Sequence, residues 1–190
     1  MFVAFLIVGK SGVNKRTQMY NEMVQLAGRD DCKEVPVNKE RLQVLIDAAV
    51  DVGANQQRDT IYKALFLAKS TDSTDVDLMI AEVATKQMMS SDIREVLIRD
   101  VLRKRKNPVV VPVLMAYCRS TNDSRAAINS IQACRFMATD NDLPKFLDIV
   151  IYNNNANIRK VAEETASEIL KKSVNRESLG ATIGLSLIHI

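Results

Sequence analysis

An arginine recurs four times along this chain at nearly regular intervals. The four are Arg58, Arg94, Arg125 and Arg159, and the intervals between them are 36, 31 and 34 residues. Each follows a short polar run typical of a helix cap, and an apolar residue comes three positions later on the adjoining turn of the same helix face. Such a recurrence is typical of stacked two-helix units. The sequence therefore predicts an all-α array of about four helical pairs.

Amphipathic stretches, separated by short runs rich in Asn, Asp, Ser and Thr, indicate where the helices lie. Pro112 and Pro144 stand 32 residues apart near the start of two of them, where proline removes no intrahelical hydrogen bond. Glycine numbers only 6 and aromatic residues make up 5% of the chain, which argues against a β-rich fold. We expect helices over residues 15–27, 39–52, 56–69, 75–88, 92–105, 108–119, 123–137, 143–152 and 156–172.

Two segments carry a resemblance to a known family. Val111-Pro112-Val113-Leu114 and Leu143-Pro144-Lys145-Phe146 resemble the first helix of a HEAT repeat, and Ile158-Arg159-Lys160-Val161-Ala162 resembles the second. The resemblance covers residues 38 to 172 and implies a HEAT-like solenoid, a right-handed α-α superhelix. The period is shorter than the ~40 to 47 residues of most HEAT units, so armadillo-like stacking stays open. Tetratricopeptide repeats are excluded, because their tryptophan is missing from a chain with 0 Trp.

The regular recurrence of the four arginines indicates a structural role. A residue that each repeat needs for stacking returns in each repeat, whereas a ligand site is usually irregular. We therefore predict that each guanidinium reaches an acceptor at a helix end or in the next repeat. Pro112 and Pro144 are predicted to be structural repeat positions of the same kind.

One segment of the chain is strongly basic. The net charge is +3, while residues 99–106 alone carry +4, so the rest of the chain is close to neutral. The residues that could bind an anionic partner are Arg99, Arg103, Lys104, Arg105 and Lys106. Cations at a helix C-terminus also interact favourably with the helix dipole, and no aromatic residue interleaves this cluster to stack on a base. Nucleic-acid binding through this segment is therefore an alternative function rather than the leading one.

The residues that most often carry catalysis are scarce. The three cysteines, Cys32, Cys118 and Cys134, show no C-x-x-C spacing, and the single histidine is His189. We expect no catalytic residue, no metal site and no cofactor, and hence no enzyme. A non-catalytic scaffold or adaptor that binds another protein is the leading hypothesis, because helical stacks expose long, shallow surfaces. A HEAT-like lyase such as a bilin lyase remains a second alternative.

The ends of the chain differ from the array, which we place at residues 38–173. Residues 1–14 are an apolar segment, interpreted as a capping element or as the end of a longer signal or membrane anchor. Residues 15–37 are expected to form a capping helix and loop, and residues 174–190 an irregular tail. The last six residues, 185–190, resemble a translated sequencing adapter and are interpreted as an artefact at the end of a metagenomic fragment. A cytoplasmic location is favoured, with membrane anchoring or export expected if residues 1–8 end a longer anchor.

Overall fold

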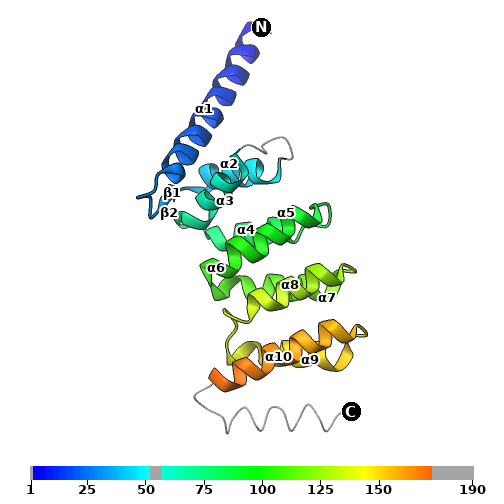
Figure 1. Cartoon of the computed structure of the whole chain (residues 1–190). Helices are drawn as coiled ribbons and strands as arrows, with labels where there is room; N and C mark the ends of the chain where they lie inside the picture. Colours follow the sequence, from blue (N-terminus) through cyan, green and yellow to red (C-terminus); the bar gives the residue numbers. More distant parts are fainter. Residues whose placement is uncertain (1, 52–56, 173–190) are drawn as a thin grey trace. The chain divides into compact units, whose positions relative to one another are not determined.

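The computed structural model of the chain describes residues 2–51 and 57–172, and for residues 2–13 it describes the backbone alone. The described chain is mostly helical, as the sequence predicts, with one short pair of strands (Figure 1). It divides into two compact units, Met1–Ile80 and Ala81–Ile190. The tail expected over residues 174–190, including residues 185–190, lies outside the described residues.

Helices make up most of the first unit. They are α1 (Phe2–Gly28), α2 (Lys39–Val50), α3 (Arg58–Leu67) and the first residues of α4 (Val76–Ala84), which continues into the second unit. Helix α1 packs against both α2 and α3. Asn38 caps α2, because its side chain accepts a hydrogen bond from the Arg41 backbone N–H at 2.9 Å. The side chains at the centre of this unit are fully buried: Met23, Leu42, Leu45, Ile61 and Leu65.

Helix α1 differs from the predicted boundary. The sequence predicts a separate apolar segment over residues 1–14 and a helix that begins at Lys15, whereas α1 is continuous from Phe2 to Gly28. Gly9 and Gly12 lie inside this helix, although glycine is a poor helix former, and they do not interrupt it. Two ion pairs join its middle to α2, from Lys15 to Glu40 at 3.0 Å and from Arg16 to Asp47 at 2.5 Å.

A short parallel strand pair lies in the first unit and was not predicted. Strand β1 (Val35–Val37) pairs with β2 (Ala68–Ser70), with Val35 opposite Ala68 and Val37 opposite Ser70. The helix expected over residues 56–69 therefore ends at Leu67. Residues 68–70 are extended because their backbone forms hydrogen bonds with β1. The burial of both valines of β1 holds that strand in place. Three residues are too few for an alternation pattern to reveal a strand.

The second unit contains helices that follow one another with short connections. The segments α5 (Ser91–Val96), η2 (Leu97–Leu102), which is π-helical, and α6 (Arg103–Arg105) run on without a break. The other elements are η3 (Pro108–Val110), α7 (Val111–Ser120), α8 (Ser124–Cys134), η4 (Asp140–Asp142), α9 (Leu143–Tyr152) and α10 (Ala156–Lys172). The bounds predicted for the last two helices, 143–152 and 156–172, are confirmed.

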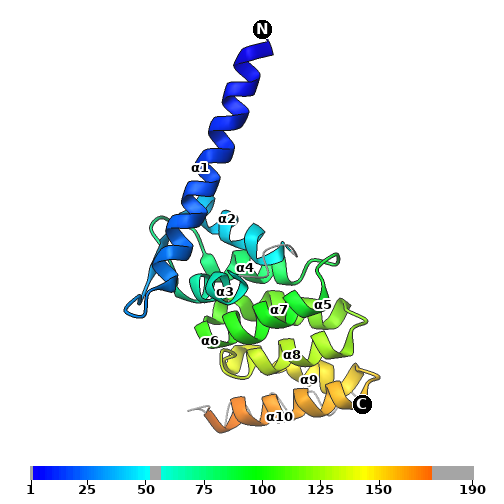
Figure 2. The same ribbon diagram turned by 45° about the horizontal axis from the view of Figure 1, so that its top comes forward.

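Within the second unit the paired helices pack on each other, and the second helices also pack on the second helices of the neighbouring pairs. Helix α7 packs against α8, and α9 against α10. Helix α8 also contacts α5 and η2 on one side and α10 on the other, an order that Figure 2 shows clearly. The largest side chains buried between these helices are Leu97, Ile98, Leu114, Met115 and Phe146.

Prolines stand at the first turns of three of these helical segments. Pro108 begins η3, and Pro112 and Pro144 occupy the first turns of α7 and α9. The N–H that proline lacks would have no intrahelical partner at these positions. Asn107 caps η3 by accepting a hydrogen bond from the Val109 N–H at 3.2 Å. The last two helical pairs therefore begin where the sequence predicts them.

Candidate functional site

Arg94 is buried and bonded to the end of the preceding helix. Its side chain is 6% exposed, its Nε donates to the Ala84 carbonyl at 3.0 Å and its Nη2 donates to the Lys86 carbonyl at 2.8 Å. The guanidinium also lies 5.2 Å from the centre of the Tyr117 ring. The Ala84 carbonyl lies at the end of α4, where it has no partner inside the helix, so Arg94 satisfies it. The Lys86 carbonyl also accepts from the Met89 N–H at 3.1 Å.

The other three recurring arginines have different surroundings. Arg159 donates from Nη1 to the Asn153 carbonyl, at the end of α9, at 2.8 Å. Arg125 is largely exposed and forms an ion pair with Glu95 at 2.5 Å. Arg58 is half-buried at the start of α3 and makes neither a hydrogen bond nor an ion pair among the contacts between described residues. Only Arg94 and Arg159 therefore reach carbonyls at a helix end.

The N-terminal caps of the second helices are joined from one pair to the next. Asp123 caps α8 by accepting from the Arg125 and Ala126 N–H groups, at 3.0 and 3.1 Å, and also accepts from the Ser91 hydroxyl at 3.4 Å. Asn155 caps α10, and its Nδ2 donates to the Ser124 hydroxyl at 3.0 Å. At the other end of α8, Arg135 pairs with Glu168 of α10. Each cap thus serves its own helix and contacts the neighbouring one.

The predicted basic segment is partly neutralised by its own neighbours. Arg99 pairs with Glu95 at 2.5 Å and with Asp100 at 2.8 Å, and Lys104 lies 3.8 Å from the same Asp100 carboxylate. The hydrogen bond from Arg99 lowers the pKa of Asp100 and keeps it charged. Lys106 ends the helix with a left-handed φ of 56°. The charge of Arg99 is therefore paired with two carboxylates, unlike the charge of Lys106 at the end of the helix.

The structure adds an aromatic residue that the sequence analysis missed. Arg103 lies 4.8 Å from the centre of the Phe136 ring, and the Lys172 ammonium lies 5.9 Å from it. Phe136 is 44% exposed, and Lys172 also donates to the Arg135 carbonyl at 3.2 Å. Phe136 follows Arg103 by 33 residues, which is close to the spacing of the recurring arginines. That spacing is the feature of the sequence from which this contact could have been predicted.

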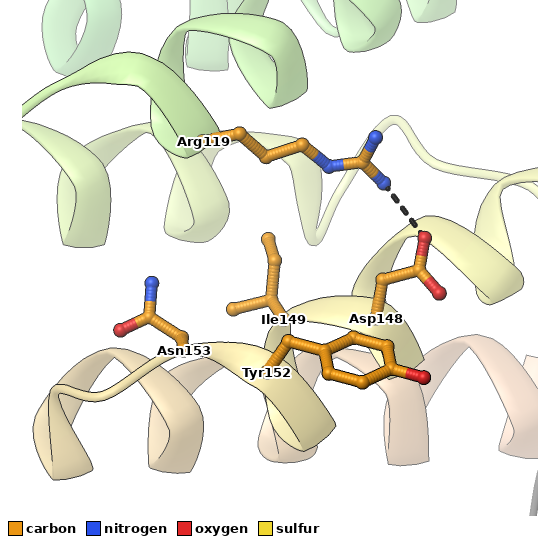
Figure 3. A pocket seen from close by; sticks show the side chains of 5 residues that line it. All are labelled: Arg119, Asp148, Ile149, Tyr152 and Asn153. Carbon is orange, nitrogen blue, oxygen red and sulfur yellow. Dashed lines mark hydrogen bonds and ion pairs between the residues drawn. The ribbon is translucent and has the colours of Figure 1, made fainter.

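Two open hollows lie at the connections between paired helices. One, of about 360 Å³, is lined by Arg119 of α7 and by residues at the end of α9. Figure 3 shows Arg119 reaching toward Asp148, to which it donates at 3.1 Å, with the Tyr152 ring beside that carboxylate. The other, of about 560 Å³, has Arg94 and Tyr117 in its lining, with hydroxyl and amide side chains around them. Both are partly open to solvent.

Two of the cysteines are unsuited to nucleophilic chemistry. Cys118 and Cys134 are buried in α7 and α8, and burial raises the pKa of Cys118 to about 11 and that of Cys134 further. A thiol must lose its proton to attack a substrate, so both stay unreactive near neutral pH. Cys32 is half-buried in the loop after α1.

Three further observations bear on the class of protein. Among the described residues, no group of His, Cys, Asp and Glu side chains is arranged to hold a metal ion. No helix within residues 2–51 and 57–172 is both long and apolar enough to cross a membrane. Comparisons of the chain with protein-family models, with curated proteins and with solved structures found no match.

Proposed function

We propose that the helical pairs of this chain belong to a right-handed HEAT-like superhelix that acts as a non-catalytic scaffold for another protein. The observation that carries the proposal is the direct stacking of second helices at the period of the sequence repeat. Helix α8 contacts α5 and η2 before it and α10 after it, and hydrogen bonds from a cap to the first residue of the preceding second helix join residues 31 and 32 positions apart. Stacked pairs that contact only their neighbours are the basis of solenoid proteins.

The packing also indicates which surface a partner would contact. The second helices α8 and α10 pack against each other, while an open hollow separates Arg119 on α7 from Tyr152 on α9. Close second helices and more widely spaced first helices would curve the array with the second helices on its inner side. Concave surfaces of this kind are the usual binding surfaces of helical repeat proteins.

The chemistry of the described residues favours binding over catalysis. The hollows are partly open to solvent, whereas sites for small substrates usually enclose most of the ligand. The thiols of Cys118 and Cys134 are held protonated by burial. A long surface with mixed charge suits a folded domain or an extended peptide better than a small molecule.

A pair of photocrosslinking variants tests this proposal. Benzoylphenylalanine replaces Glu163, an exposed residue on the second helix α10, or Ala116, an exposed residue on the first helix α7. After irradiation in an extract of the cells that carry the gene, we expect a protease-sensitive adduct from position 163 and little adduct from position 116. Equal yields at the two positions, or an adduct removed by nuclease instead of protease, would contradict the proposal.

A further inference from the structure

Cations from the two helical segments on either side of α8, α6 and α10, lie against one half-exposed aromatic ring in the second unit. Helix α6 and the C-terminal end of α10 lie on the same edge of this unit in both views (Figures 1 and 2). Phe136, in the turn after α8, lies between them because Arg103 and Lys172 both contact its ring. We call this surface the basic edge and define it by its members: Arg103, Lys104, Lys106, Phe136, Lys171 and Lys172.

The carboxylates near the basic edge already have other partners. Asp100 accepts from Arg99 at 2.8 Å and lies 3.8 Å from Lys104, and Glu168 pairs with Arg135. Among the described residues, Arg103, Lys106, Lys171 and Lys172 form no ion pair. Among the described residues, four cations of the basic edge therefore have no carboxylate partner, and only Lys104 lies near one, at 3.8 Å from Asp100.

The helix dipole explains only part of this arrangement. Lysines in the last turn of α10 face the negative end of that helix, and Lys172 donates to the Arg135 carbonyl. Arg103, in contrast, lies over the Phe136 ring of the next repeat, and that ring stays 44% exposed. A half-exposed ring flanked by cations offers one apolar contact with charge on either side of it.

We propose that the basic edge binds an acidic peptide segment of a partner protein, an inference that rests on the scaffold function proposed above. Carboxylates of such a segment would pair with Arg103, Lys104 and Lys106 on one side and with Lys171 and Lys172 on the other, while an apolar side chain contacts Phe136. A single-stranded nucleic acid fits less well, because the cations over the ring take the place that a stacked base needs.

Binding of two probes to the intact chain tests the inference. The probes are a fluorescent polyglutamate peptide containing one leucine and a fluorescent oligothymidylate, each titrated by anisotropy at low and at physiological salt. We expect the peptide to bind more tightly than the oligonucleotide. No peptide binding at low salt, or tighter binding of the oligonucleotide, would overturn the inference.

Charge-matched variants locate the binding surface. The triple variant Lys104→Gln, Lys106→Gln, Lys171→Gln removes three exposed cations from the basic edge, and Lys33→Gln, Lys39→Gln, Lys160→Gln removes three exposed cations elsewhere. We expect the first to weaken peptide binding by about tenfold or more, and the second by less than about twofold. Equal losses would show attraction by net charge alone and would overturn the inference.

Two further readouts separate the alternatives. Phe136→Leu keeps an apolar side chain at the half-exposed position. We expect this variant to bind the peptide more weakly while its circular dichroism spectrum stays unchanged. An unchanged affinity would show that the Phe136 ring does not contact the peptide. If the peptide fails to bind while the crosslinker at position 163 still captures a protein, the basic edge is wrong and the scaffold function stands. Failure of position 163 in turn counts against the scaffold function itself.

Discussion

Arg94 and Arg125 occupy equivalent positions in the sequence repeat, yet their surroundings differ. Arg94 is buried and bonded to two carbonyls, whereas the Arg125 side chain is 72% exposed and has one ion pair. The sequence predicts the same stacking role for both. It cannot tell them apart, because burial depends on the loop before each helix, and that loop is longer before Arg94 than before Arg125.

The two arginines should therefore contribute unequally to stability. We expect Arg94→Ala to lower the free energy of unfolding by about 1–3 kcal/mol, because the buried Ala84 carbonyl loses its donor. Arg125→Ala should lower it by less than about 1 kcal/mol, since an exposed ion pair is weak. Urea denaturation followed by circular dichroism measures both. Equal losses would show that the shared repeat position matters more than burial.

At the scale of elements, α7 and α8 pack so closely that both of their thiols are buried. Cys118 is 2% exposed and Cys134 is 0% exposed, as expected for cysteines at apolar helix positions. The apolar periodicity of the sequence predicts the burial of these cysteines because it extends over many residues. It does not predict β1 and β2, whose pairing depends on contacts between residues far apart in the chain.

The buried thiols predict a loss of stability in alkali. A thiol with a pKa near 9.0 in the unfolded chain and about 11 in the folded one stabilises the fold fully below pH 9. That contribution, about 3 kcal/mol for Cys118, is lost as the pH rises from about 9 to about 11. Urea unfolding under reducing conditions should show a shallower decline for Cys118→Ala, Cys134→Ala than for the unaltered chain. The half-buried Cys32→Ala is the control and should leave the slope unchanged; equal slopes in all three would refute the assignment.

At the scale of the whole molecule, the proposed repeat architecture makes stability local. Each helical pair of the second unit contacts the pairs next to it, so a defect in one pair should affect its neighbours more than distant helices. Phe146 of α9 is fully buried and is the largest such side chain in the described structure, which makes its position a sensitive one.

Hydrogen exchange of a Phe146 variant tests this local stability. Phe146→Ala should cost about 3–5 kcal/mol and speed amide exchange in α9 and α10, with a smaller effect in α8 and none in β1 and β2. Tyr152→Ala, at a site 71% exposed on the same helix, should change little. Mass spectrometry of exchanged peptides measures the pattern, and a uniform increase throughout the chain would contradict a repeat architecture.

The sequence by itself determined that this chain is helical and where most helices begin and end. Caps, prolines and apolar periodicity act within a turn or two, so Asn38, Asp123 and Pro144 can be interpreted without knowing the fold. Only the tertiary structure decided which cations pair with carboxylates and which lie against a ring. Arg99 pairs with carboxylates of its own helix, while Arg103 meets Phe136 33 residues away, because stacking of second helices brings distant turns to one edge.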